Sequence, residues 1–181
     1  MAPPLVSVFF DTTVLCSAIL SPDGLCMRLF ELAHAGFIAP VITREVIAEF
    51  DRNCRAGFGN IAIGDGDIAE FCALLSPVLD VAMIRGTTVG RAMGPALPIL
   101  GVGPVQIVQV PIGTPAAVTR MLDAGTLALK DPFDLHVVAA ALANGCRYLC
   151  TSNTRDLPDS LVVGELEFIR PERLHRLVQE W

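Results

Sequence analysis

Short apolar runs rich in β-branched and aromatic residues alternate with segments of helical periodicity along this chain of 181 residues. The clearest runs have the length of buried strands and lie at residues 5–10, 37–42, 146–151 and 165–169, with weaker candidates at 81–84 and 105–110. Helices are expected at residues 14–20, 25–36, 43–57, 67–79, 114–125, 131–145 and 171–181. Because strands that alternate with helices favour parallel pairing, the sequence predicts an α/β fold with a mainly parallel sheet.

The chain is predicted to be a single domain over residues 1–181, because no internal repeat or clear linker divides it. The regular pattern is lost between residues 85 and 111, where glycine, proline and β-branched residues dominate. We expect this segment to be an irregular insertion, or a loop that contains a hairpin.

The hydrophobic content is high for a chain outside a membrane, at 52% of the residues with a mean hydropathy of +0.56. No run approaches the roughly 18–20 uncharged apolar residues that a membrane span requires. The N-terminus has no basic region of the kind found in a signal peptide. We therefore expect a cytoplasmic protein without a membrane anchor.

Charge and cysteine spacing exclude two further classes of protein. The net charge of −6 argues against a broad basic surface that coats nucleic acid, although an enzyme contacting a short stretch of RNA or DNA remains compatible with it. The 6 cysteines form no C-x-x-C pair, so a zinc site is disfavoured. We expect them to be reduced and buried as small apolar residues.

Polar residues follow two of the predicted strands directly. Asp11 comes after the run at 5–10, and the segment TSNTRD at 151–156 comes after the run at 146–151. In an open α/β sheet, ligands bind outside the carboxyl ends of the strands, so both positions are candidates for a site. An aspartate at a strand end can also cap a helix or form a turn, and this remains the alternative for Asp11.

The predicted helix at 43–57 carries two glutamates that share a face, Glu45 and Glu49. Thr43 is a good N-cap, which makes Glu45 an acid of the first turn that the helix dipole explains. Glu49 lies beyond that turn, next to the apolar stripe. It is a candidate site residue, with a solvated surface glutamate as the alternative.

Two aspartates three residues apart begin the helix at 131–145. Asp131 precedes Pro132 and is best explained as the N-cap, and Asp134 then falls at the third helical position, where a capping acid is also common. A carboxylate held at a helix N-terminus stays ionised and oriented, so a cap can also serve as a metal ligand.

Four acidic segments together resemble the PIN domain, the metal-dependent nuclease fold of VapC-type toxins; they are FFDTTVLCSAI, ITREVIAEF, DPFDLHVVAAALANG and YLCTSNTRDLP. The resemblance covers residues 5–80 and 114–175, whereas residues 85–111 have no counterpart. It implies a three-layer α/β/α architecture whose central, mainly parallel sheet has four to five strands.

Carried over position by position, the resemblance implies a metal site built from carboxylates. The implied ligands are Asp11, Glu49, Asp134 and Asp156, with Glu45 as the alternative to Glu49. Thr151 and Asn153 match a T-x-N element and complete the implied catalytic set, although many members have aspartate where this chain has Asn153. Because Mg²⁺ and Mn²⁺ prefer carboxylate and water oxygens, one of these ions is the expected cofactor.

The resemblance implies an endoribonuclease, the toxin of a toxin–antitoxin pair, with RNA as substrate, an antitoxin protein as partner and a homodimeric state. A catalytically inactive PIN-like module that binds RNA or protein is the alternative, motivated by Asn153 and the segment at 85–111. A phosphatase that forms an aspartyl-phosphate at Asp11 is a weaker candidate, because the second aspartate two residues on is absent. The histidines at 34, 136 and 175 are expected to be structural or solvated.

Overall fold

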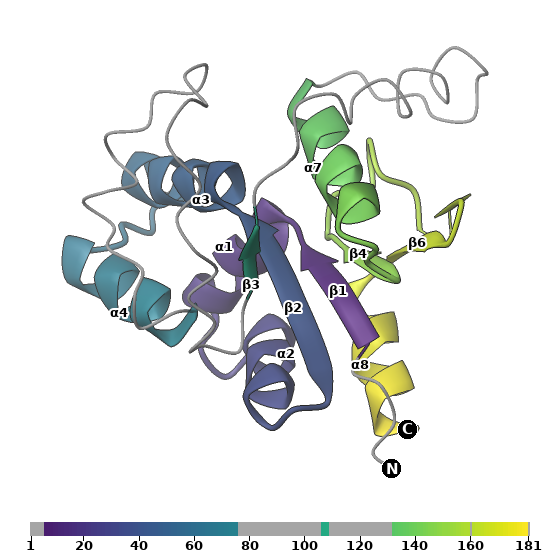
Figure 1. The fold of residues 1–181 in the computed structure, drawn as a ribbon. Coiled ribbons are helices and arrows are strands. Elements are labelled where there is room, and N and C mark those ends of the chain that lie inside the picture. The colour runs from purple at the N-terminus through teal and green to yellow at the C-terminus, as the bar shows by residue number, and fades with distance from the viewer. Residues whose placement is uncertain (1–5, 76–105, 109–131, 160, 181) are drawn as a thin grey trace.

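The computed structural model describes residues 6–75, 106–108, 132–159 and 161–180. Its strands and helices alternate as the sequence predicts (Figure 1). The strands are β1 (Val6–Phe10), β2 (Ile38–Thr43), β3 (Gln106–Val108), β4 (Tyr148–Cys150), β5 (Val162–Val163) and β6 (Leu166–Ile169). The helices are α1 (Thr12–Leu20), α2 (Leu25–His34), α3 (Arg44–Ala56), α4 (Asp65–Leu75), α7 (Pro132–Ala143) and α8 (Pro171–Gln179).

The described strands form one sheet in the order β3-β2-β1-β4-β6-β5. All neighbouring pairs are parallel except β5 with β6. Figure 1 shows α7 in front of the sheet and α1 behind it, so helices cover both faces. The predicted three-layer α/β/α fold is therefore confirmed, with the two-residue antiparallel β5 added at one edge.

The chain order of the strands creates a crevice beside β1. From β1 the chain proceeds outward to β2 and β3, and it then returns to the other side of β1 with β4 and β6. The strand order of this parallel sheet therefore reverses beside β1. At such a point the loops that follow the two neighbouring strands lead to opposite faces of the sheet, which leaves a crevice at the carboxyl ends of these strands. Phe10 pairs with Cys150 at this point, so Asp11 and Thr151 emerge side by side.

A line of phenylalanine rings holds the helices against the sheet. Phe10 of β1 packs edge-on against Phe30 of α2, with ring centroids 5.1 Å apart. Phe30 in turn packs against Phe71 of α4, and Phe71 against Phe50 of α3. Buried aromatic pairs of this kind contribute apolar area and preferred geometry together. The line fixes α3, and with it the glutamates that α3 carries, relative to the end of β1.

Several element boundaries differ from the sequence prediction. Helix α1 begins at Thr12, two residues early, because Asp11 caps it by accepting a hydrogen bond from the Thr12 amide. Helix α4 begins at Asp65 rather than residue 67. The predicted cap Thr43 does accept a hydrogen bond from the Val46 amide. Predictions for 81–84, 114–125 and Asp131 lie outside the described residues, as does most of 85–111, within which only β3 is described.

Within the part of the chain that the structure describes, no single helix has the length and apolar content needed to cross a membrane, although the bent pair α1 and α2 passes that test when taken together. All six cysteines are free and buried, as the sequence predicts. The single-domain prediction for residues 1–181 stays a prediction.

Candidate active site

A pocket of about 400 Å³ opens at the carboxyl ends of β1 and β4. Among the residues that line it are Asp11, Glu49, Asp134, Asn153 and Asp156. These residues come from the end of β1, from α3, from α7 and from the loop after β4, so the fold collects them from four separate parts of the chain. Figure 1 shows α3 and α7 on either side of the strand ends.

Asp11 lines the pocket and is 4% exposed. One carboxylate oxygen accepts from the Thr12 amide at 2.7 Å. The other accepts from the hydroxyls of Thr13 at 2.9 Å and Thr151 at 2.6 Å. The alternatives posed for Asp11 thus coincide, because it caps α1 and also lies in the pocket.

Burial raises the pKa of the Asp11 carboxyl above its ordinary value, while the hydrogen bonds from Thr151, Thr13 and Thr12 oppose that rise. Removal from water disfavours the charged form, and donors that point at the oxygens favour it. A cation bound beside Asp11 would act in the same direction as these donors.

Glu49 lies in the pocket, where it accepts a hydrogen bond from the Thr12 hydroxyl. Glu45 lies one turn earlier on α3, with its side chain 40% exposed and its carboxylate 3.6 Å from His136 Nε2. It is not among the pocket-lining residues of the described chain. The structure therefore places Glu49, and not the alternative Glu45, with the other acidic residues.

Asn153 lies between two carboxylates on the opposite wall. Its amide nitrogen is 3.4 Å from Asp134 Oδ1 and 3.4 Å from Asp156 Oδ2. Its amide oxygen accepts from the backbone of Arg155 and Asp156, which closes an Asx-type turn. Asp156 therefore points inward, toward the pocket.

The loop that carries Thr151, Asn153 and Asp156 is held at both ends by Arg170. The guanidinium donates to the backbone carbonyl of Thr151 at 2.8 Å and to that of Leu157 at 2.6 Å. Arginine suits this task because its rigid fork presents two donors in one plane. The loop is thereby clamped against the start of α8.

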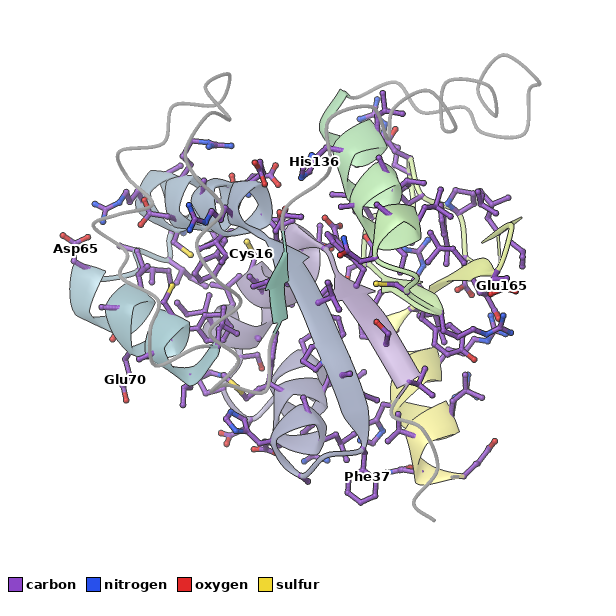
Figure 2. The ribbon with its side chains drawn as sticks, in the orientation of Figure 1. Cys16, Phe37, Asp65, Glu70, His136 and Glu165 are labelled. Carbon is purple, nitrogen blue, oxygen red and sulfur yellow. The ribbon has the colours of Figure 1, made fainter. Side chains whose placement is uncertain are left out.

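His136 joins α7 to the end of β2 and the start of α3. Its Nε2 lies 3.0 Å from the Thr43 hydroxyl, and Figure 2 shows the ring projecting toward α3. Burial lowers the pKa of His136, although the Glu45 carboxylate raises it, so burial prevails. His136 is not a pocket-lining residue among those described, and neither are His34 and His175.

The donor set fits a hard divalent cation, since the walls offer carboxylate, hydroxyl and amide oxygens. As they lie, no three acidic, histidine or cysteine side chains of the described residues converge closely enough to hold an ion. Asp11 and Glu49 are turned toward threonine hydroxyls instead.

Sequence reasoning did not identify Thr12, Thr13 or Arg170 as part of the site. Thr13 links the end of β1 to the loop after β4, because its hydroxyl donates to Asp11 and also accepts from the Ser152 amide at 3.0 Å. The signal for the threonines was their position directly after Asp11. Arg170 carried no such signal, since its role depends on how α8 returns beside β4.

Comparison with models of known protein families matches residues 7–155 to the PIN domain. The matched segment includes all the predicted site residues except Asp156. A search of curated proteins gives no match.

Proposed function

This chain belongs to the PIN domain family, and from that premise we propose that it is a Mg²⁺- or Mn²⁺-dependent endoribonuclease. PIN domains are generally nucleases, and the resemblance inferred from the four acidic segments is confirmed at this level. The enzyme cleaves RNA in the cytoplasm and is the toxin of a toxin–antitoxin pair.

The observation that carries the proposal is the shared pocket of Asp11, Glu49, Asp134 and Asp156 at the reversal point of the sheet. Ligand sites of open α/β sheets lie at such points. Four carboxylates in one pocket repel one another, and a divalent cation offsets that repulsion.

Asp11, Glu49, Asp134 and Asp156 would hold the ion, which when bound would activate water and stabilise charge on the leaving oxygen. The chain's own groups then have separate tasks. Thr151 and Thr13 orient Asp11 by donating to the same oxygen, and these donors favour its ionised form against the effect of burial. Asn153 offers an N–H to the space between Asp134 and Asp156, where it can donate to a phosphate oxygen or to the attacking water.

RNA cleavage with Mn²⁺ and with EDTA tests the proposal on the wild type, on Asp134→Asn and on the matched control Asp23→Asn. Asp23 is exposed in the turn between α1 and α2. We expect metal-dependent cleavage by the wild type and the control, and a loss of roughly 100-fold or more in Asp134→Asn. Equal cleavage by all three proteins would remove Asp134 from the catalytic set.

A second candidate function is a PIN-like module that binds RNA or protein without cleaving it. The observation that favours it is the amide of Asn153, which contributes no charge between two acids where a carboxylate would hold an ion more strongly. Absence of metal-dependent cleavage on every RNA tested, with RNA binding retained, would support this candidate.

The partners in the proposal are an antitoxin protein and a second copy of the chain, and their support is the family resemblance alone. Growth arrest on expression of the wild type, relieved in Asp134→Asn, would support the toxin role. Light scattering of the purified chain tests the homodimer.

A further inference from the structure

Besides its acidic residues, the pocket is lined by a set of uncharged side chains, which we call its second half. This half is lined by Cys16, Ser17 and Leu20 of α1, by Asn53 of α3 and by Phe58. The whole pocket, at about 400 Å³, has the size of a site for a small organic ligand and is larger than an ion alone requires. The metal proposed above would be held by the acidic residues, so the proposed function assigns no role to the residues of the second half.

Phe58 is presented to the pocket by a tight turn. The turn follows the end of α3 at Gly57 and is closed by two backbone hydrogen bonds between Phe58 and Ile61, at 2.9 and 3.1 Å. Gly57 and Gly59 have φ values of 77° and 63°, which side chains rarely tolerate, so the turn is specified by the sequence. Phe58 is partly buried against the core while it also lines the pocket. An aromatic ring supported in this way is a platform on which a planar group can stack.

Asn53 lies one helical turn after Glu49 and on the same face of α3. Asn53 and the Cys16 thiol both line this part of the pocket. Burial raises the pKa of that thiol to about 12, so this wall of the pocket carries no charge at neutral pH. An amide offers both donors and an acceptor, which is the complement of a nucleobase edge.

We propose that Phe58 and Asn53 form a subsite for one nucleobase of a single-stranded substrate, next to the phosphate held at the acidic half. The ring of Phe58 stacks on the base and the amide of Asn53 contacts its polar edge. A base inside a duplex cannot reach such a pocket, so the subsite selects unpaired RNA. This inference rests on the proposed function, because the nuclease site supplies the phosphate-binding half.

Equilibrium binding of small ligands to the whole chain in Mg²⁺ tests the subsite without catalysis. The probes are the four nucleoside 5′-monophosphates and ribose 5-phosphate, which lacks the base. We expect at least one monophosphate to bind about fivefold or more tightly than ribose 5-phosphate, since stacking of a base on an aromatic side chain contributes at this level. Equal affinity for all five probes would overturn the inference.

Substitutions of Phe58 test whether this residue causes the difference in affinity between the monophosphates and ribose 5-phosphate. Phe58→Leu keeps an apolar side chain but removes the ring face, and it should abolish the preference for the base while ribose 5-phosphate binds as before. Phe58→Tyr should retain it. Phe37→Leu is the matched control, because Phe37 is 52% exposed and lies at the opposite end of the molecule from the strand ends (Figure 2).

Asn53→Asp provides a second route if Phe58→Leu does not fold. A carboxylate has no donors, so this variant should change the order of affinity among the four monophosphates. An unchanged order, together with an unchanged preference in any folded Phe58 variant, would overturn the assignment.

Cleavage of oligonucleotides that contain one abasic position at a time separates this inference from the proposed function. Cleavage that is slowed by one abasic position beside the scissile phosphate, in the wild type but not in Phe58→Leu, supports both. Cleavage that no abasic position slows retains the nuclease and overturns the subsite. If no oligonucleotide is cleaved, the proposed nuclease fails, and the binding experiment alone decides the subsite.

Discussion

Asp11 shows how one residue can stabilise a helix and destabilise the fold at the same time. As N-cap it satisfies the first amide of α1, which usually favours folding. As a carboxylate that is 4% exposed, it has lost most of its hydration, and three donors replace only part of it. Such a balance is characteristic of groups retained for function rather than for stability.

Asp11→Asn is predicted to abolish cleavage and to raise the Tm in metal-free buffer at neutral pH. The raised pKa of Asp11 means that the folded chain holds a proton more tightly than the unfolded chain. This group therefore favours folding most below pH 3.8, and its contribution is lost as the pH rises through the folded-state value. The amide keeps the shape without the charge, and its nitrogen can donate to Thr13 and Thr151.

Thermal unfolding in EDTA measures this effect, with a Tm gain of roughly 2–4 °C for each kcal/mol in a chain of this size. The Tm difference between the variant and the wild type should widen as the pH rises above 3.8 and through the folded-state pKa of Asp11. A variant that is less stable than the wild type at every pH would show that the cap outweighs the cost of the buried charge.

Arg170 is predicted to act on catalysis through the loop it clamps. Arg170→Ala leaves the carbonyls of Thr151 and Leu157 without their donor and should lower the free energy of unfolding by roughly 1.5–3 kcal/mol. Arg170→Lys restores the charge but not the two-pronged geometry, so it should recover only part of kcat. Urea unfolding and cleavage kinetics measure the two effects, and full activity in Arg170→Ala would contradict the clamp.

At the scale of the helix, α3 separates Glu49, which the sequence favours as the site residue, from Glu45, which it leaves open as the alternative. Both lie on one face of α3, but the Glu45 carboxylate lies beside His136, whereas the Glu49 carboxylate lies in the pocket and accepts a hydrogen bond from Thr12. The difference arises from the position of α3 in the fold, where Phe50 packs against Phe71 of α4. Periodicity gives the shared face, whereas only tertiary packing decides which turn of the helix meets the site.

Glu49→Gln is therefore predicted to reduce kcat by roughly 100-fold or more, whereas Glu45→Gln should leave it within a few-fold of the wild type. The pair is matched in side chain, helix and charge change. Single-turnover cleavage at saturating Mn²⁺ compares the two variants. A larger loss in Glu45→Gln would reverse the assignment that the geometry supports.

The extent to which sequence predicts structure also differs among elements. The sequence predicts strands that are buried on both faces, such as β1 and β4, because a short continuous apolar run is typical of a strand inside a parallel sheet. The two-residue β5 was missed, since a strand that short is specified by its partner β6 and not by its own residues. The acids of the site were found from strand ends and helix starts, whereas Arg170 and Phe58 act through contacts that no local pattern records.

At the scale of the whole molecule, the order of the strands is what makes the site. Residues more than a hundred positions apart, such as Thr13 and Thr151, meet because β1 and β4 are neighbours across the point where the sheet reverses. The local sequence supplies carboxylates at strand ends, and the topology brings them to one place. The fold therefore holds several carboxylates, which repel one another, in one pocket at the carboxyl ends of β1 and β4.

Metal binding is therefore predicted to stabilise the whole chain. An ion that binds the folded but not the unfolded state at 100 times its Kd adds about 2.7 kcal/mol, and this corresponds to a Tm increase of about 5–11 °C for a chain of this size. Thermal unfolding with EDTA, Mg²⁺ or Mn²⁺ measures it. The gain should be much smaller in Asp134→Asn and unchanged in Asp23→Asn, because only the first removes a carboxylate from the pocket.

The same titration separates the two candidate functions without any RNA. A nuclease of the proposed type requires an ion at the acidic half of the pocket, so its Tm must rise with Mg²⁺ or Mn²⁺ and saturate. A binding module that has lost its metal would show the same Tm in both salts as in EDTA at matched ionic strength, since screening alone acts equally on the wild type and on Asp134→Asn. A saturating rise confined to proteins that retain Asp134 would tie the ion to the residue at the start of α7, where the sequence placed both a helix cap and a metal ligand.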